Sequence, residues 1–163
     1  MRRLLFLFLS VVVTACSTID CPVQNTVSIY YAVKKLNGEV EVADTLKDTL
    51  SIWTRRSNGT DTLLYNQGVN TTKLELPVSY SHPEDVWVFR IADTSHIATI
   101  DTVWIKKNDI PHFESVDCSA HFFHELTAVR STHLRIDTIL INNPSVTYDP
   151  LVVNLHIRFK ARR

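Results

Sequence analysis

Short apolar segments separated by tight turns are the feature that most limits how this chain of 163 residues can fold. The sequence contains only three glycines, and two of them lie in the pairs Asn37-Gly38 and Asn58-Gly59, between runs of apolar and polar residues. An Asn-Gly pair in this setting is typical of a two-residue β-hairpin. Gly68 lies in a further polar break. The pattern therefore predicts strands joined by hairpins, with almost no helix.

The turns divide the chain into about nine or ten short strands. We expect strands at residues 27–36, 39–46, 49–56, 61–66, 73–80, 86–92, 97–106, 134–141 and 151–159. In the last run, Leu151, Val153, Leu155, Ile157 and Phe159 alternate with other residues, which predicts a half-buried strand. Many short strands with tight turns indicate an all-β fold. We expect an antiparallel β-sandwich, of which the immunoglobulin-like sandwich is one form.

Residues 119–130 fit two local structures. Ser119 can cap a helix on which Phe122, Leu126 and Val129 share one face. The same residues can form a strand with Phe123 turned inward. The sequence leaves a short helical turn and a bulged strand as alternatives.

The first sixteen residues have the layout of an export signal. Two arginines precede an apolar run, residues 4–13, which is too short to span a bilayer. The run closes with Val-Thr-Ala-Cys at residues 13–16, which resembles a bacterial lipobox. That resemblance implies acylation of Cys16 and membrane anchoring through its acyl chains. The alternative is an ordinary secretory signal with a cysteine near the cut by accident.

These observations divide the chain into three parts. Residues 1–15 are expected to be a lipoprotein signal peptide, and residues 16–25 a lipidated N-terminus and tether. Residues 26–163 are expected to form a single β-sandwich domain, and a chain of this length can fold on its own.

The chain has three cysteines, and lipidation of Cys16 leaves Cys21 and Cys118 as an even pair. Exported proteins meet an oxidising compartment, so we expect a disulfide between these two residues. It would close a loop of nearly a hundred residues, which is worth about 4.7 kcal/mol in the chain-entropy model. The weaker alternative is a free Cys118 that acts as a nucleophile.

Charge and motifs argue against several functions. Without Arg2 and Arg3 the chain carries 15 basic and 17 acidic residues, so no nucleic-acid partner is expected. No Gly-x-Ser-x-Gly motif occurs, and the three glycines leave none for a phosphate-binding loop. We therefore expect no enzyme, no catalytic residue and no cofactor, although a triad of distant residues would escape motif analysis.

One segment is rich in potential metal ligands. The set is His112, Glu114, Asp117, Cys118, His121, His124 and Glu125. On a helix, His121, His124 and Glu125 would lie on adjoining faces, whereas on a strand the two histidines would point to opposite sides. No zinc-ligand spacing is matched, so we expect no metal site.

The three tryptophans fall into two classes. Trp87 lies in an apolar run with Phe89 and Ile91 and is expected in the core. Trp53 would share a strand face with Ser51 and Arg55, and Trp104 with Thr102 and Lys106. Tryptophans on such mixed faces can bind sugars or peptides. The alternative is that both cap the rim of the sandwich.

Six of the eleven aspartates are followed by threonine. Five of these pairs continue with an aliphatic residue, at Thr45, Thr49, Thr62, Thr102 and Thr138. The triplets resemble the O-glycosylation acceptor motif of Bacteroidota, which implies glycans on exposed threonines. The alternative is structural, because Asp favours turns while Thr and aliphatic residues open strands.

Several segments together resemble a family of small uncharacterised lipoproteins of Bacteroidota. They are the lipobox, residues 16–22, residues 111–118, Phe122-Phe-His124 and residues 141–149. The resemblance covers essentially the whole chain and implies a lipoprotein of the bacterial cell envelope, but no activity. Only Asp20 follows the predicted lipidated cysteine closely, so we expect an outer-membrane protein that faces the periplasm rather than one displayed outside.

We therefore expect a non-enzymatic structural or protein-interaction module whose partner is another envelope protein. The alternative is a glycan- or peptide-binding module that uses Trp53 and Trp104.

Overall fold

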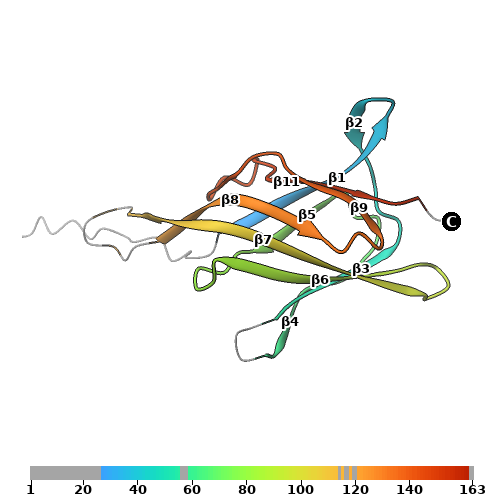
Figure 1. The fold of residues 1–163 in the computed structure, drawn as a ribbon, viewed down its shortest axis with the longest axis horizontal. Coiled ribbons are helices and arrows are strands. Elements are labelled where there is room, and N and C mark those ends of the chain that lie inside the picture. Colours follow the sequence, from blue (N-terminus) through green and yellow to red (C-terminus); the bar gives the residue numbers. More distant parts are fainter. Residues whose placement is uncertain (1–26, 56–58, 114, 116–117, 119–120, 162–163) are drawn as a thin grey trace, which may run out of the picture.

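The computed structural model describes residues 27–55, 59–113, 115, 118 and 121–161. These residues contain no helix and form eleven strands (Figure 1). The strands are β1 (Ser28–Asn37), β2 (Val40–Ala43), β3 (Thr49–Arg55), β4 (Asp61–Gly68), β5 (Lys73–Pro77), β6 (Glu84–Ala92), β7 (Ala98–His112), β8 (His121–Ser131), β9 (Ile136–Ile141), β10 (Ser145–Val146) and β11 (Leu155–Phe159). No helical segment with the length and hydropathy of a membrane span occurs among the residues described.

The strands form two packed sheets. One sheet has the order β2-β1-β11-β9, with β5 also paired to β1, and the other has the order β10-β8-β7-β6-β3-β4. The pair β1 and β11 is parallel, and the other pairs are antiparallel. The prediction of an all-β sandwich is confirmed.

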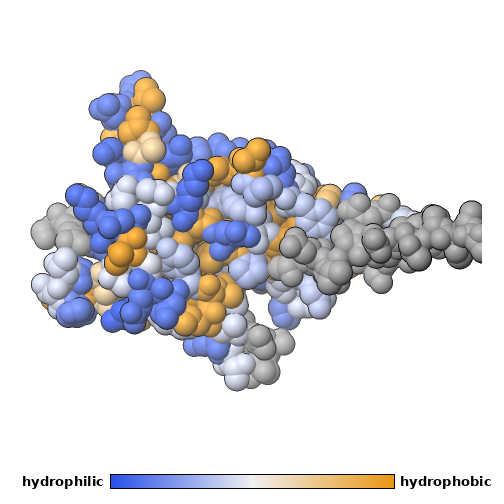
Figure 2. Space-filling view, turned by 180° about the vertical axis from the view of Figure 1, so that it is seen from behind, coloured by the Kyte–Doolittle hydropathy of each residue, from blue (hydrophilic) through white to orange (hydrophobic). Residues whose placement is uncertain are grey.

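The first expected hairpin is present. Asn37 pairs with Val40, and Gly38 between them has a φ of 66°, a conformation that glycine adopts without a steric penalty. This hairpin of β1 and β2 projects from the body of the molecule (Figure 1). Seen from behind, the projecting arm carries hydrophobic side chains among hydrophilic ones (Figure 2), and Leu36 and Val40 are exposed on it.

The sandwich core is built by inward-facing apolar side chains of both sheets. Trp87, Phe89 and Ile91 of β6 are at most 2% exposed, so their prediction as core residues is confirmed. The ring of Tyr31, from β1 in the other sheet, lies 5.8 Å from the ring of Trp87. Burial of these large side chains supplies much of the hydrophobic stabilisation between the sheets.

The last strand is shorter than its alternation predicts. The strand is Leu155–Phe159, while Leu151 is 88% exposed and lies outside it. The reason is the buried Asn154, whose Oδ1 accepts the N–H of Tyr30 at 3.0 Å and whose Nδ2 donates to the carbonyl of Ser145 at 2.7 Å. The Asn154 side chain thus links β1 to β10 just before β11 begins. Residues 151–153, which precede it, form a loop instead of a strand.

The segment for which the sequence allowed either a helical turn or a bulged strand forms a strand. Residues 121–131 form β8, which pairs with β7 along its length and shows a register shift opposite Lys106 and Lys107. The helical alternative is therefore wrong, and a strand with an irregularity is observed. Leu126 packs into the core, and the Phe123 ring stacks on His112 with centroids 4.2 Å apart. Long-range pairing with β7 outweighs the local helical pattern.

Candidate functional site

Trp53 and Trp104, the residues of the alternative ligand-binding hypothesis, lie on one outward face of the six-stranded sheet. Trp53 on β3 is opposite Val88 of β6, and Trp104 on β7 is opposite Val86 of the same strand. Val86 and Val88 are two residues apart, so they project from the same face of β6, and Trp87 between them projects into the core. Trp53 and Trp104 are therefore on the same face, with one strand between them.

Exposed apolar side chains continue this face. Leu63 of β4 lies opposite Trp53 and is 45% exposed, and Ile100 of β7, four residues before Trp104, is 54% exposed. Together with Val88 these side chains form what we call the outer-face patch. Its members are Trp53, Leu63, Val88, Ile100 and Trp104.

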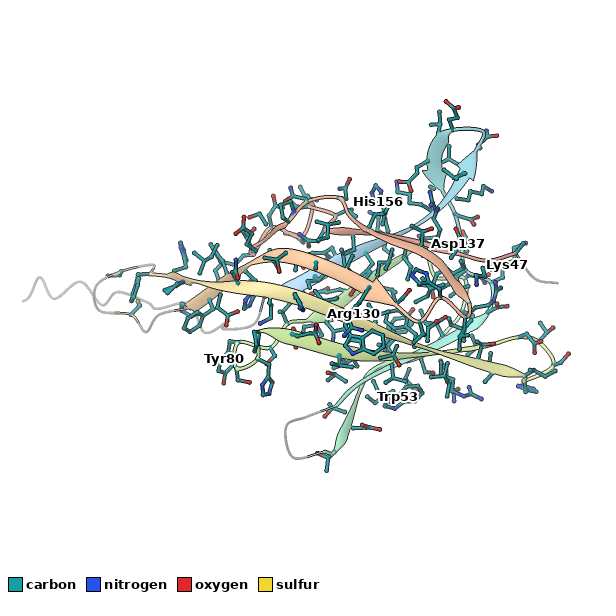
Figure 3. The ribbon with its side chains drawn as sticks, in the orientation of Figure 1. Lys47, Trp53, Tyr80, Arg130, Asp137 and His156 are labelled. Atoms are coloured by element: carbon teal, nitrogen blue, oxygen red, sulfur yellow. The ribbon has the colours of Figure 1, made fainter. Side chains whose placement is uncertain are left out.

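One side of the Trp104 ring is already occupied. The Arg130 guanidinium of β8 lies 3.9 Å from the centroid of this ring, and Arg130 also approaches Glu84, with Nη2 3.6 Å from Oε1. Figure 3 labels Trp53 and Arg130 on this sheet. A guanidinium over an indole is a cation–π contact, so Trp104 offers at most its other side to a ligand. Trp53 is half-exposed and has no such cover in the described contacts.

The predicted lipid and disulfide sites lie mostly outside the described residues. Cys16 and Cys21 belong to residues 1–26, so lipidation and the pairing of Cys21 with Cys118 stay predictions. Cys118 is buried at 8% exposure and is the only cysteine among the described residues.

All five threonines of the Asp-Thr triplets are half-buried. Two of the preceding aspartates have clear structural roles. Asp48 is buried and pairs with Arg135, with Oδ2 2.7 Å from Nη2. Asp101 is also buried and accepts four hydrogen bonds. The structural explanation therefore accounts for the triplets at Thr49 and Thr102, while glycosylation stays a prediction.

The candidate metal ligands do not converge. His121 and His124 lie on the strand β8 three residues apart, so they point to opposite faces. His124 instead places Nδ1 2.7 Å from Oδ1 of Asp109. Glu114 and Asp117 lie outside the described residues. Within the described part of the chain, no group of three or more histidines, cysteines or acidic residues has the arrangement of a metal site.

Sequence reasoning missed a polar group near the start of β6 and the neighbouring part of β7. Its members are Asp85, Lys107 and His124, which are buried, and Asp109, whose side chain is 29% exposed. The side chain of Lys107 is fully buried, and its Nζ donates to the His82 carbonyl at 2.7 Å and to Asp109 Oδ1 at 3.0 Å. The sequence did contain a signal for the burial of Lys107. Val103, Ile105 and Lys107 share one strand face by alternation, and the first two are apolar.

Burial affects the protonation of this polar group. It lowers the pKa of His124 below its ordinary value, although Asp109 acts in the opposite direction. Burial also raises the pKa of Asp85 to about 6, against the opposing effects of Lys107 and the Ser79 N–H. At neutral pH His124 is therefore neutral.

Comparison with known proteins finds one family. The model of a family of unknown function, DUF6452, matches residues 49–159, from the start of β3 to the end of β11. The matched segment includes the whole six-stranded sheet with the outer-face patch, and β5, β9 and β11 of the other sheet, whereas β1 and β2 precede it. No curated protein and no solved structure matches the chain.

Proposed function

We propose that this chain, which belongs to the DUF6452 family of unknown function, is a lipid-anchored, non-enzymatic protein of the bacterial cell envelope that binds another envelope protein through its outer-face patch. Lipidation of Cys16 and a position in the outer membrane facing the periplasm are part of this proposal. They are supported by the lipobox-like residues 13–16 and by the resemblance to lipoproteins of Bacteroidota.

The observation that carries the proposal is the placement of Trp53 and Trp104 on one exposed face. Tryptophan and arginine are enriched among the residues that dominate binding energy at protein interfaces, and here Arg130 lies over Trp104. The exposed Leu63 and Ile100 extend the apolar area on both sides. A β-sheet face of this kind suits a protein surface, since it is broad and four cavities found in the molecule are lined by other residues.

Site-specific photo-crosslinking in the native envelope tests the partner. A photoreactive residue at Leu63 is expected to yield a discrete crosslinked protein. The matched control is Leu140 on β9, which is exposed to nearly the same degree, 47% against 45%, but belongs to the other sheet. A partner captured equally from both positions, or from Leu140 alone, would contradict the outer-face patch as the interface.

Labelling tests the anchor separately. Radiolabelled palmitate is expected to enter the wild-type protein and not the Cys16→Ser variant. Equal labelling of the two proteins would contradict lipidation at Cys16 and would leave the proposed interface unaffected.

A second candidate is a glycan- or peptide-binding module on the same face. One strand separates Trp53 from Trp104 and their positions are offset by two residues, which puts their backbones about 12 Å apart and within reach of a single extended ligand. Glycan-array binding that disappears in Trp53→Ala would favour this candidate. Binding that survives both Trp53→Ala and Trp104→Ala would exclude these residues as the site.

A further inference from the structure

A cavity of about 440 Å³ opens where β5 passes into β6, away from the outer-face patch. Leu64, Val78 and Trp87 give it apolar walls, and Thr54 and Thr62 contribute hydroxyl groups. Tyr80, labelled at this end of the molecule in Figure 3, lies at its exposed rim. Ser79, Ser81, His82 and Asp85 also line it, so the cavity combines an apolar wall with several polar groups and has the size of a site for a small ligand.

The carboxylate of Asp85 lines this cavity with an unused acceptor. Asp85 is 6% exposed, and its Oδ2 accepts the Ser79 N–H at 3.3 Å. Within the described part of the chain, the other carboxylate oxygen accepts no hydrogen bond. A buried carboxylate with so few hydrogen bonds is costly unless a further donor reaches it.

The ammonium group of the neighbouring Lys107 already donates hydrogen bonds to other groups. Lys107 donates to Asp109 and to the His82 carbonyl, and it thereby holds the loop between β5 and β6. The hydroxyl of Tyr31 is fully buried near Asp85 and has no hydrogen-bond partner in the described structure. His82 and Tyr80 are the other titratable side chains that line the cavity. Because the Lys107 ammonium is bound to Asp109 and to the His82 carbonyl, no cationic group donates a hydrogen bond to Asp85 among the described residues.

We infer that this cavity binds a small primary amine, whose ammonium group contacts Asp85 and whose apolar part lies against Leu64 and Trp87. An ammonium group brings a positive charge to the buried Asp85 carboxylate and carries three N–H donors. The hydroxyl oxygens of Thr54 and Thr62 can accept the two donors that Asp85 leaves free. A neutral ligand would fill the same space but leave the charge uncompensated, and an anion would be repelled.

This site is independent of the proposed protein interface. Asp85 and Trp87 project inward from β6, whereas Val86 and Val88 project toward the outer-face patch. Loss of amine binding would therefore leave the crosslinking result at Leu63 unchanged.

Three probes of one shape test the inference on the folded protein by NMR titration. Benzylammonium, benzyl alcohol and benzoate differ mainly in charge, and the indole N–H signal of Trp87 reports on the cavity. We expect saturable binding of benzylammonium, binding of benzyl alcohol weaker by about tenfold, and no shift with benzoate. Equal affinity for the ammonium and the alcohol, or no saturable shift with benzylammonium, would overturn the inference.

Variants locate the site. Asp85→Asn is expected to weaken benzylammonium binding by about tenfold, whereas Glu39→Gln, which removes a carboxylate at the exposed tip of the first hairpin, is expected to leave it unchanged. Thr62→Trp, on the edge strand β4, places an indole at the cavity while leaving Asp85 in place, so it serves even where Asp85→Asn fails to fold. We expect it to abolish binding. Unchanged binding in Thr62→Trp would show that the amine binds elsewhere.

Discussion

Asp101 Oδ2 accepts the backbone N–H of Ile136 at 2.8 Å, which ties the first part of β7 in one sheet to the first residue of β9 in the other. The same carboxylate accepts the N–H of Leu134 and of Arg135 and the hydroxyl of Thr132 at 2.6 to 2.7 Å. Burial acts to raise the pKa of Asp101, but these hydrogen bonds outweigh it, and the pKa lies below its ordinary value. The Asp101 side chain thus binds the loop between β8 and β9 through four hydrogen bonds.

Replacement of this carboxylate should destabilise the fold. In Asp101→Asn an amide N–H₂ would face backbone N–H donors, and we expect a loss of roughly 3 kcal/mol in the free energy of unfolding. Urea denaturation measures this loss. Asp61→Asn, which changes an exposed aspartate that also precedes a threonine, should shift stability by less than about 0.5 kcal/mol. Equal effects of the two changes would contradict the structural role of Asp101.

The stability contributed by Asp101 should depend on pH. Its pKa is lower in the folded state than in the unfolded state, so the contribution is complete above the unfolded pKa of about 3.9. It should be lost as the pH falls from there through the folded pKa. Acid titration of the unfolding free energy is expected to show this loss in the wild type and a smaller one in Asp101→Asn.

Asp85 should have the opposite pH dependence. Its folded pKa is about 6, above the unfolded value, so the folded state binds the proton more tightly. The free energy of unfolding should therefore rise as the pH falls from about 7 to about 4, by up to roughly 3 kcal/mol. Asp85→Asn should remove this rise. A wild-type stability that is flat over this range would contradict a buried, poorly compensated carboxylate.

The Asp-Thr triplets should differ in modification. Thr45 lies in a segment between β2 and β3, whereas Thr102 lies in β7, between the paired strands β6 and β8. If the protein is O-glycosylated, as proposed from the triplets, we expect a glycan at Thr45 and none at Thr102. Intact-mass analysis should show a loss of glycan mass in Thr45→Val and no loss in Thr102→Val. Mass lost only in Thr102→Val would contradict this assignment.

The expected disulfide has its own test. Peptide mapping without reduction should recover a peptide in which Cys21 is joined to Cys118. Replacement of both cysteines by serine should lower the free energy of unfolding by about 4 kcal/mol, because a long loop is no longer closed. Recovery of both cysteines as free thiols from protein isolated under oxidising conditions would exclude the bond.

The sequence alone was sufficient for the β class and for the local turns. Asn37-Gly38 encodes a hairpin through backbone conformation, and the alternation around Trp87 encodes a buried face, since both signals lie within a few neighbouring residues. Local patterns also predicted that Trp53 and Trp104 would differ from Trp87.

Tertiary structure decided what depended on partners distant in the chain. Residues 121–131 are a strand because β7 pairs with them, and the regular alternation before Leu155 ends because Asn154 bonds to Tyr30, 124 residues away. The order of β3, β6 and β7 puts Trp53 and Trp104 on one face, and the loop between β5 and β6 closes a cavity over Asp85. Such pairings are chosen by burial and hydrogen bonding across the whole sandwich, which no short stretch of sequence contains.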